Sequence, residues 1–397
     1  MVPLSLSVLT TNHVVSSKLY YTGLKFLSKK HQCLFLLKIC SSFKQIYQIH
    51  AQIQISGLTG DTFLLTELVR FCSLSKVKDL NHARSLVHHS NNLPTSSWNI
   101  LIRGYSSSDS PREAIWVFLG MRRRGIRPNS LTFPFLLKAC ATVAALFEGK
   151  LVQAEVVKYG LDCDVYVQNN LINFYGSCKK IRDAQKVFDA MTDRTVVSWN
   201  SVITACVESS WLQDGIEYFW QMRNYGFEPD ETTMVLMLSA CAEIGNLSLG
   251  RLLHSQLILK GMILNCQLGT ALVDMYAKSG AVHCARLVFD SIKKRNVWTW
   301  SAMILGLAQH GFAKEALKLF PEMINSPSVR PNYVTFLGIL CACSHAGMVN
   351  DGYQFFEDME HVYGIKPMMI TLWCHGGYLG SCWPSHGGLY VHKEHAY

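Results

Sequence analysis

Apolar side chains recur at helical spacing in two short runs between residues 165 and 195. The first stripe contains Leu171, Ile172 and Tyr175. The second stripe has the members Ile181, Ala184, Val187, Phe188 and Met191. Steps of three and four residues place such side chains on one face of an α-helix. Gly176 and Ser177 stand between the stripes, so the pattern predicts two short helices with the turn at these two residues.

This pattern returns along the chain at an interval of 101 residues. Trp98, Trp199 and Trp300 stand in the similar stretches SSWNILI, VSWNSVI and WTWSAMI. One interval divides into segments of 35, 35 and 31 residues, each of which fits a pair of helices. One pair this short cannot bury its apolar face, whereas a stack of pairs can. The sequence therefore predicts an all-α protein with the architecture of an α-solenoid.

Composition supports a buried core and a polyanionic partner. The chain of 397 residues is 49% hydrophobic and 16% charged, with 37 Lys+Arg against 28 Asp+Glu. This composition argues against intrinsic disorder, and the net charge of +9 suits nucleic acid. Cys140, Cys241 and Cys343 lie in apolar runs at nearly the same interval, which favours core packing over disulfides or a metal site.

The N-terminus differs from the rest of the chain. It is basic and rich in Ser and Thr, and its first acidic residue is Asp61. Residues 1–32 therefore resemble an organellar transit peptide and leave mitochondrion and chloroplast open. The uncharged stretch 333–349 is only 17 residues long. A membrane-spanning helix needs about 20 apolar residues, so no membrane partner is expected.

Several stretches carry a family resemblance. They are VVSWNSVITA at 196–205, LTFPFLLKACA at 131–141, ALVDMYAKSG at 271–280, DAQKVFDAM at 183–191, CSHAGMVNDG at 343–352 and YGIKP at 363–367. In combination they resemble the plant pentatricopeptide repeat (PPR) proteins of the PLS subfamily, in which P, L and S repeats alternate. The resemblance implies a right-handed superhelix of about ten helix-turn-helix repeats of 31–36 residues. The repeats are L at 33–61, S at 62–94, P at 95–129, L at 130–164, S at 165–195, P at 196–230, L at 231–265, S at 266–296, P at 297–332 and L at 333–368.

The C-terminal part departs from this pattern. Residues 369–397 have no helical period and suggest an irregular, frameshifted tail, and the family's E/DYW extensions are missing from the sequence. Pro321 interrupts a helical stripe, which predicts fraying because an interior proline costs about 3 kcal/mol.

In this family each repeat reads one base of single-stranded RNA with its fifth and last residues. The resemblance assigns this role to Asn99, Asn129, Asn169, Asn200, Asp230, Thr270, Asn296, Ser301 and Asn332. It implies a pyrimidine for the pair Asn99–Asn129, uracil for the pair ending at Asp230, and adenine for the pairs ending at Asn296 and Asn332. Asn169 pairs with Thr195, a departure from the pattern. The L segments have apolar fifth residues and are expected to act as spacers. A helix cap is the alternative role for each Asn or Asp.

Basic clusters provide candidate contacts to the RNA backbone. They comprise Arg122, Arg123, Arg124, Arg127, Lys179, Lys180, Lys293, Lys294 and Arg295. Phosphate attraction is one reading of these clusters, and cations at solvated helix ends are the other. The recurring Trp residues could stack on bases, but packing between repeats is favoured.

The sequence contains no P-loop, G-x-S-x-G or H-E-x-x-H motif. His392 and Glu394 form H-x-E, but no P-C-x-x-C follows, as a zinc deaminase would require. We therefore expect no enzyme, metal or cofactor. The predicted function is sequence-specific binding of single-stranded organellar RNA in RNA processing, with C-to-U editing-site recognition favoured and a deaminase or editing factor supplied in trans. The alternatives are a protein-interaction scaffold, indifferent to RNA sequence, and a nonfunctional truncated product.

Overall fold

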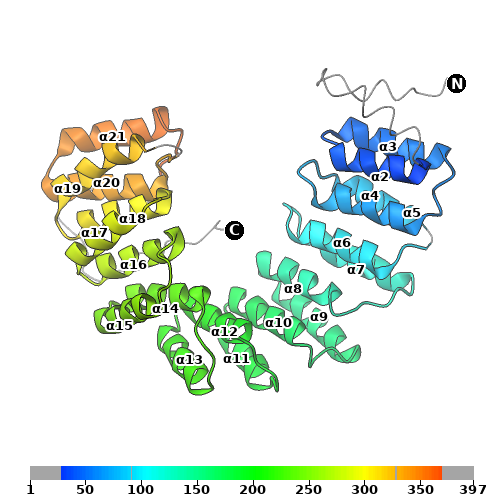
Figure 1. Ribbon diagram of the computed structural model, residues 1–397, viewed down its shortest axis with the longest axis horizontal. Coiled ribbons are helices and arrows are strands. Elements are labelled where there is room, and N and C mark those ends of the chain that lie inside the picture. Colours follow the sequence, from blue (N-terminus) through cyan, green and yellow to red (C-terminus); the bar gives the residue numbers. More distant parts are fainter. Residues whose placement is uncertain (1–27, 91, 327–328, 369–397) are drawn as a thin grey trace. The chain divides into compact units, whose positions relative to one another are not determined.

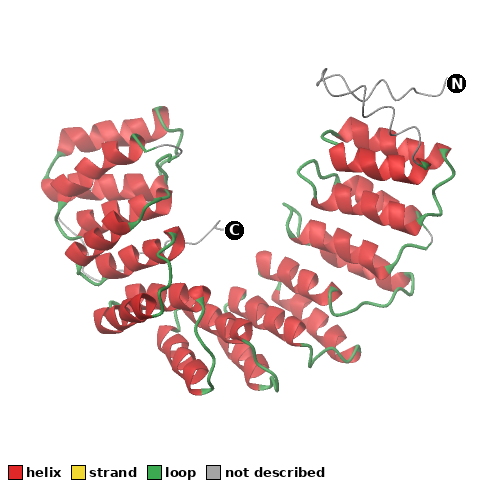
Figure 2. Ribbon diagram, viewed as in Figure 1, coloured by secondary structure: helices red, strands yellow, loops and turns green. Residues whose placement is uncertain are grey.

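The computed structural model describes residues 28–90, 92–326 and 329–368. Within these ranges all regular structure is helical, and 20 α-helices follow one another (Figure 2). The all-α prediction is confirmed. The predicted leader up to residue 27 and the predicted tail from residue 369 lie outside the described residues. Residues 28–32 were assigned to the leader, but the first described helix already begins at Lys29.

The helices fall into two compact units, divided between Trp211 and Leu212 (Figure 1). The first unit contains α2 (Lys29–Ile39), α3 (Phe43–Ile55), α4 (Thr62–Leu74), α5 (Leu80–His89), α6 (Thr95–Ser106), α7 (Glu113–Arg123), α8 (Thr132–Thr142), α9 (Leu146–Lys158), α10 (Val165–Ser177), α11 (Ile181–Asp189) and α12 (Val196–Glu208). The second unit contains α13 (Leu212–Asn224), α14 (Glu231–Ile244), α15 (Leu247–Leu259), α16 (Cys266–Lys278), α17 (Val282–Ser291), α18 (Val297–Gln309), α19 (Ala313–Ile324), α20 (Tyr333–Ala346) and α21 (Val349–His361).

Within each unit the helices pack in sequential pairs, and the first helices of successive pairs also pack on one another. In the first unit α4, α6, α8, α10 and α12 form this continuous layer, and in the second α14, α16, α18 and α20 form it. We call these helices the first-helix layer. The second helix of each pair packs against first helices, as α7 does against α6 and α8. The stacked helix pairs predicted from the 101-residue period are thus confirmed.

Small residues allow the first helices to approach one another closely. A Cβ atom added to Gly176 of α10 would lie 2.7 Å from the Cβ of Ala205 in α12, and one added to Gly306 of α18 would lie 2.5 Å from that of Ala277 in α16. The prediction of a turn at Gly176 and Ser177 was wrong, because α10 continues through both. The turn follows at residues 178–180, where Lys179 adopts a φ of 57°. Gly176 is required by packing rather than by a turn.

Helix α19 continues through Pro321 to Ile324, so the predicted fraying is not observed. Pro321 lies on the exposed face, and its carbonyl oxygen accepts a hydrogen bond from the N–H of Asn325 at 3.0 Å. Leu319, Phe320 and Met323 are buried beside it. Tertiary packing of this apolar face offsets the hydrogen bond that the proline cannot donate.

The recurring Cys and Trp residues belong to the core. Cys140 and Cys241 are fully buried, and burial raises their thiol pKa values to about 12 and about 11. Trp199 packs edge-on against Phe188 with ring centroids 4.8 Å apart, and Trp300 packs against Phe289 at 5.0 Å. The tryptophans therefore join neighbouring helix pairs, as favoured from the sequence. Among the described helices, none has the length and apolar character to cross a membrane.

Candidate nucleic-acid interface

The predicted base-reading residues occupy two kinds of position. Those at fifth positions all lie in first helices: Asn99 in α6, Asn169 in α10, Asn200 in α12, Thr270 in α16 and Ser301 in α18. Those at last positions lie just before the next first helix: Asp230, Asn296 and Asn332 directly precede α14, α18 and α20, and Asn129 stands three residues before the start of α8. The helix pairs therefore place all of these residues along the first-helix layer of their own unit.

Two of the predicted pairs are in direct side-chain contact. Asn99 Nδ2 donates to Asn129 Oδ1 at 2.9 Å across 30 residues of sequence. Ser301 Oγ donates to Asn332 Oδ1 at 3.1 Å across 31 residues. Asn200 and Asp230 belong to different units, so this structure does not place them relative to each other.

A third pair meets through an intermediate hydroxyl. Thr270 Oγ1 lies 2.7 Å from Thr299 Oγ1, which in turn donates to Asn296 Oδ1 at 3.0 Å. Asn169 is different, because its Oδ1 is buried and has no hydrogen-bond partner among the described residues. A buried carbonyl oxygen in that state is uncommon and costly.

The last-position residues also cap helices. The Oδ1 atoms of Asp230, Asn296 and Asn332 accept the N–H of the third residue of the following segment at 2.8–3.0 Å. This is the capping role considered as the alternative from the sequence. Capping uses the Oδ1 atom of the side chain, so the second polar atom of the same carboxylate or amide group can still contact a base. Capping and base reading are therefore compatible.

The two members of a pair differ in exposure. Asn99 and Asn169 are each 6% exposed, Asn200 is 8% exposed and Ser301 only 1% exposed. Asn129, Asp230 and Asn296 are exposed, and Asn332 is half-buried. A ligand that approaches the first-helix layer therefore meets the last-position residue before the fifth-position residue beneath it.

Exposed apolar side chains accompany these polar residues, which the sequence analysis missed. The second residues of five predicted segments are 47–59% exposed: Phe63, Leu131, Tyr166, Val197 and Trp298. Each lies at or next to the N-terminal end of a first helix, three residues before the fifth position. The aromatic members, Phe63, Tyr166 and Trp298, can stack on nucleic-acid bases without sequence preference. The sequence shows each of them as an apolar residue at the second position of a segment, outside the helix face that carries the buried residues.

A second set missed from the sequence is cationic. Arg70, Arg103 and Lys138 are exposed on α4, α6 and α8, each at the ninth position of its predicted segment. Four residues are about one helical turn, so these cations lie on the same helix face as the fifth positions. The guanidinium of Arg103 lies 5.6 Å from the ring centre of Phe135 in α8. Cations on that face can contact the phosphates of a strand bound there.

The predicted basic clusters lie at the ends of second helices and in the turns. Arg122 pairs with Glu155 at 2.7 Å, and Lys179 donates to the carbonyl oxygen of Glu208. Arg124 donates to the carbonyl oxygen of Ser90 at 3.1 Å and lies over the ring of Trp98. The remaining cluster members except Arg295 are exposed: Arg123, Arg127, Lys180, Lys293 and Lys294.

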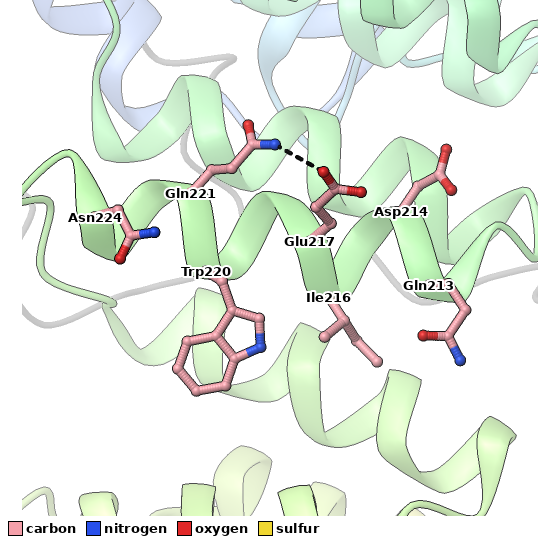
Figure 3. Close-up of a pocket in the computed structure, with 7 residues that line it drawn as sticks. All are labelled: Gln213, Asp214, Ile216, Glu217, Trp220, Gln221 and Asn224. Atoms are coloured by element: carbon pink, nitrogen blue, oxygen red, sulfur yellow. Dashed lines mark hydrogen bonds between the residues drawn. The ribbon is translucent and has the colours of Figure 1, made fainter.

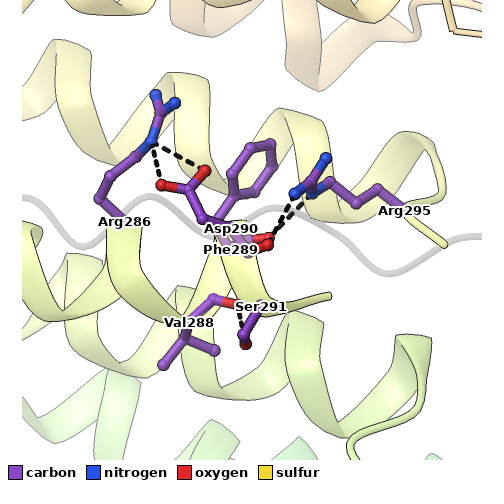
Figure 4. A network of polar contacts seen from close by, with 6 residues as sticks. All are labelled: Arg286, Val288, Phe289, Asp290, Ser291 and Arg295. Carbon is purple, nitrogen blue, oxygen red and sulfur yellow. Dashed lines mark hydrogen bonds and ion pairs between the residues drawn. The ribbon is translucent and has the colours of Figure 1, made fainter. Parts of the chain in front are cut away.

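Arg295 is held by contacts at the end of a helix (Figure 4). Its Nε donates to the carbonyl oxygen of Phe289 at 2.8 Å and its Nη2 to that of Asp290 at 3.1 Å. Its guanidinium also lies 4.4 Å from the ring centre of Phe289 and 5.6 Å from that of Trp300. These contacts satisfy carbonyl groups at the C-terminal end of α17, the role considered for cations at helix ends.

A hollow of about 510 Å³ lies along α13, lined by residues of that helix alone (Figure 3). The indole of Trp220 and the amide and carboxylate groups of Gln221 and Glu217 line it. It contains none of the predicted site residues. Among the described residues, no group of three or more His, Cys, Asp or Glu side chains is arranged to hold a metal ion.

Family models match much of the chain. A PPR repeat family model matches residues 95–142 and 194–243, a PPR repeat model matches residues 270–297, 298–327 and 334–361, and a pentatricopeptide repeat domain model matches residues 151–209. Together these matches cover most of the first-helix layer of both units.

Curated relatives come from Arabidopsis thaliana. Pentatricopeptide repeat-containing protein At2g36730 is 61% identical over 303 residues, covering 76% of this chain and 60% of its own length. The similar protein At1g59720, named chloroplastic/mitochondrial, is 39% identical and covers 87% of this chain and 55% of its own length. The protein At3g26630, named chloroplastic, is 36% identical, and the match covers 84% of this chain and 80% of that protein's length. The chain thus spans 60% and 55% of the first two relatives and 80% of the third.

Solved structures show the same architecture. The pentatricopeptide repeat protein PPR10, crystallised in complex with an 18-nt psaJ RNA element, matches with a TM-score of 0.72 at 18% identity, over 90% of this chain and 54% of that chain. At such identity the likeness establishes the fold, a helical solenoid. Together with the family models and the relative covered over 80% of its length, it shows that this chain belongs to the pentatricopeptide repeat proteins of plants.

Proposed function

We propose that this protein binds single-stranded RNA sequence-specifically, with one base facing each fifth-and-last pair. The contact between residues 30 or more positions apart, Asn99 with Asn129 and Ser301 with Asn332, carries the proposal. Such contacts gather short polar side chains at one place per repeat, where donors and acceptors can meet a base edge. The comparison structure of PPR10 was determined with RNA, which supports the same ligand class here.

The chemistry of binding divides among three sets of side chains. Exposed apolar groups such as Tyr166 and Trp298 provide faces on which bases stack. Cations on the same layer, Arg70, Arg103 and Lys138, attract phosphates whatever the sequence. The fifth-and-last pairs then select the base, because hydrogen bonds to an unpaired base edge depend on its donor and acceptor pattern.

The biological role we propose is organellar RNA processing by a PLS-subfamily member, with recognition of C-to-U editing sites favoured. The alternation of 35-, 35- and 31-residue segments supports the subfamily. The names of two relatives, which place those proteins in chloroplasts or mitochondria, support the compartment. The partner we propose for that role is a deaminase or editing factor that acts in trans.

Selection from a randomised single-stranded RNA pool with the full chain tests the proposal. We expect a pyrimidine opposite the 95–129 segment and adenine opposite the 266–296 and 297–332 segments, at fixed spacing. Asn99→Ala should remove the preference at one nucleotide and leave the others. Asn170→Ala is the matched control, because Asn170 lies in the same layer but its side chain bonds Tyr166 O at 2.8 Å. A bound fraction without enriched bases would contradict sequence-specific binding.

A protein partner is the second candidate, and the surface of α13 favours it. Trp220 is 37% exposed beside the hollow, and Tyr225 just beyond the helix is 67% exposed. Large exposed aromatic side chains are enriched where proteins bind one another. If the RNA selection enriches no bases, we expect Trp220→Ala to weaken binding to the protein partner without changing the affinity for RNA.

A further inference from the structure

Three of the predicted base-reading pairs, Asn99–Asn129, Thr270–Asn296 and Ser301–Asn332, contact a buried threonine hydroxyl that no sequence motif had singled out. Thr132, Thr299 and Thr335 are each 0% exposed and occupy the third position of the segment that follows the pair. We infer that these threonines are positioning residues that set the base preference of the neighbouring pair, an inference that rests on the proposed function. They would act through the pair and not touch the RNA.

The three hydroxyl groups contact both members of their pairs. Thr335 Oγ1 lies 2.7 Å from Ser301 Oγ and 3.0 Å from Asn332 Oδ1. Thr132 Oγ1 lies 2.8 Å from Asn99 Oδ1 and 3.2 Å from Asn129 Oδ1. The corresponding Thr299 distances to Thr270 and Asn296 are 2.7 and 3.0 Å, as described above. The arrangement therefore recurs in both units.

The protons around Asn332 fix the orientation of its side-chain amide. Its inward atom lies 3.0 Å from the backbone nitrogen of Thr335 and within 3.1 Å of the hydroxyls of Thr335 and Ser301. The backbone N–H can only donate, so the inward atom must be an acceptor. An amide nitrogen carries two protons and cannot accept, so the oxygen faces inward. The NH₂ group of Asn332 therefore faces away from Thr335, as a donor.

Asn129 is held in the same way. Its backbone N–H donates to Thr132 Oγ1 at 3.0 Å, and this hydroxyl directs its own proton toward the two neighbouring carboxamide oxygens, 2.8 and 3.2 Å away. Asn99 Nδ2 and the N–H of Leu131 also donate to Asn129 Oδ1. Both amide oxygens are thereby turned toward the threonine, and the exposed Asn129 presents its NH₂ group outward.

The orientation has a direct consequence for the base. An outward NH₂ group needs an acceptor such as the unprotonated ring nitrogen of adenine or cytosine, and it opposes the ring N–H of guanine or uracil. An amide rotated by half a turn would present oxygen and reverse that preference. The threonine hydroxyl adds a second donor beside the backbone N–H, as at Asn332, and so strengthens the orientation that determines which bases are rejected.

Thr335→Val in the full chain tests the inference, because valine keeps the shape and removes the hydroxyl. The probes are the RNA recovered from the wild-type selection and its single-base variants at the nucleotide whose preference Asn332→Ala abolishes. We expect the ratio of affinities for adenine and guanine at that nucleotide to fall about fivefold, the loss expected for one hydrogen bond. Thr335→Ser keeps the hydroxyl and should stay within about twofold of the wild type.

Thr142→Val is the matched control, because the Thr142 hydroxyl bonds only a carbonyl of its own helix, that of Lys138, at 2.9 Å. It should leave every base preference unchanged. A Thr335→Val protein that binds all probes more weakly by one common factor would show a purely structural role and overturn the inference alone. Wild-type protein without any base preference would overturn the proposed function as well. If Thr335→Val does not fold, Thr132→Val decides the same question at the nucleotide opposite the 95–129 segment.

Discussion

At the scale of single residues, arginine joins one helix pair to the next in two places. Arg194 donates to the carbonyl oxygens of Phe188 and Asp189 and lies over the rings of Phe188 and Trp199. Arg295, 101 residues later, makes the equivalent contacts with the end of α17 and with Trp300 in α18. The recurrence of these contacts in the two units indicates one structural role in the repeat, in which a cation stacks on the aromatic core and caps a helix.

Replacing Arg295 is therefore expected to reduce stability. Arg295→Ala should lower the free energy of unfolding by about 2 kcal/mol, because two charge-assisted hydrogen bonds and the stacking contact are lost. Arg295→Lys should recover only part of it, since an ammonium cannot match the planar fork of the guanidinium. Urea unfolding followed by circular dichroism measures both, with the exposed neighbour Lys294→Ala as control. Unchanged stability combined with weaker RNA binding would instead return Arg295 to the phosphate-contacting set.

At the scale of elements, periodicity was sufficient to predict helix pairs but not their ends. The 3.6-residue stripes and the 101-residue interval follow from burial, which the sequence displays directly. Gly176 near the end of α10 allows Ala205 of α12 to pack closely against it. The sequence of one segment does not reveal this contact with the next segment, so it could not show that α10 continues through Gly176. Lys179 adopts a left-handed φ without being glycine, so turn-residue preferences could not locate the turn.

Pro321 offers a test of how much the packing of α19 compensates for a poor local sequence. Pro321→Ala should raise the free energy of unfolding by about 1 to 2 kcal/mol, because an N–H is restored and the clash with the carbonyl of Leu317 is removed. The gain should be smaller than in a mid-helix position, as Pro321 lies in the last turn. Glu322→Ala, at the exposed neighbouring position, is the control for a simple alanine effect. An unchanged unfolding midpoint would mean that the helix already accommodates the proline without cost.

At the scale of the whole molecule, the cations of the first-helix layer are not evenly distributed. The ninth positions carry Arg70, Arg103 and Lys138 in three segments of the first unit. The corresponding positions of the second unit are Ser239, Asp274, Leu305 and Cys341, none of which is cationic. On the proposed function, non-specific attraction of RNA would therefore be concentrated in the first unit, whereas the predicted base-reading pairs occur in both.

Removing one of these cations should change affinity without changing specificity. Arg103→Gln is expected to weaken binding to all RNA sequences alike and to reduce the slope of log K against log salt by about 0.7, as for one phosphate contact on a single strand. Titrations at several salt concentrations measure the slope. Arg112→Gln, an exposed arginine at the start of α7, should leave it unchanged. A change in base preference in the Arg103 variant would contradict the division between attraction and selection.

The candidate site was predictable from sequence only at the positions that the family resemblance singles out. The polar residues at fifth and last positions follow from the family resemblance, whereas their contacts with each other come from the structure. The threonines between them could not be singled out, because a buried hydroxyl at a third position also fits an ordinary capping motif such as that of Asn332 and Thr335. The exposed Phe63 and Tyr166 were likewise hidden among many apolar residues, since a sequence does not say which apolar side chains fail to reach the core.

Each base-reading pair is completed by a residue that also begins the next first helix, and this has a consequence for how such genes can recombine. Asn129 belongs by position to one repeat, but its side chain is fixed by Thr132 of the next. A recombination breakpoint between Asn129 and Thr132 would place Asn129 beside the third residue of a different repeat, which need not be threonine. If the threonines set the base preference as we infer, exchange of repeats between related genes would preserve a recognised base only when the breakpoint lies beyond the third residue, and the sequence that specifies one nucleotide of RNA would be longer than one repeat.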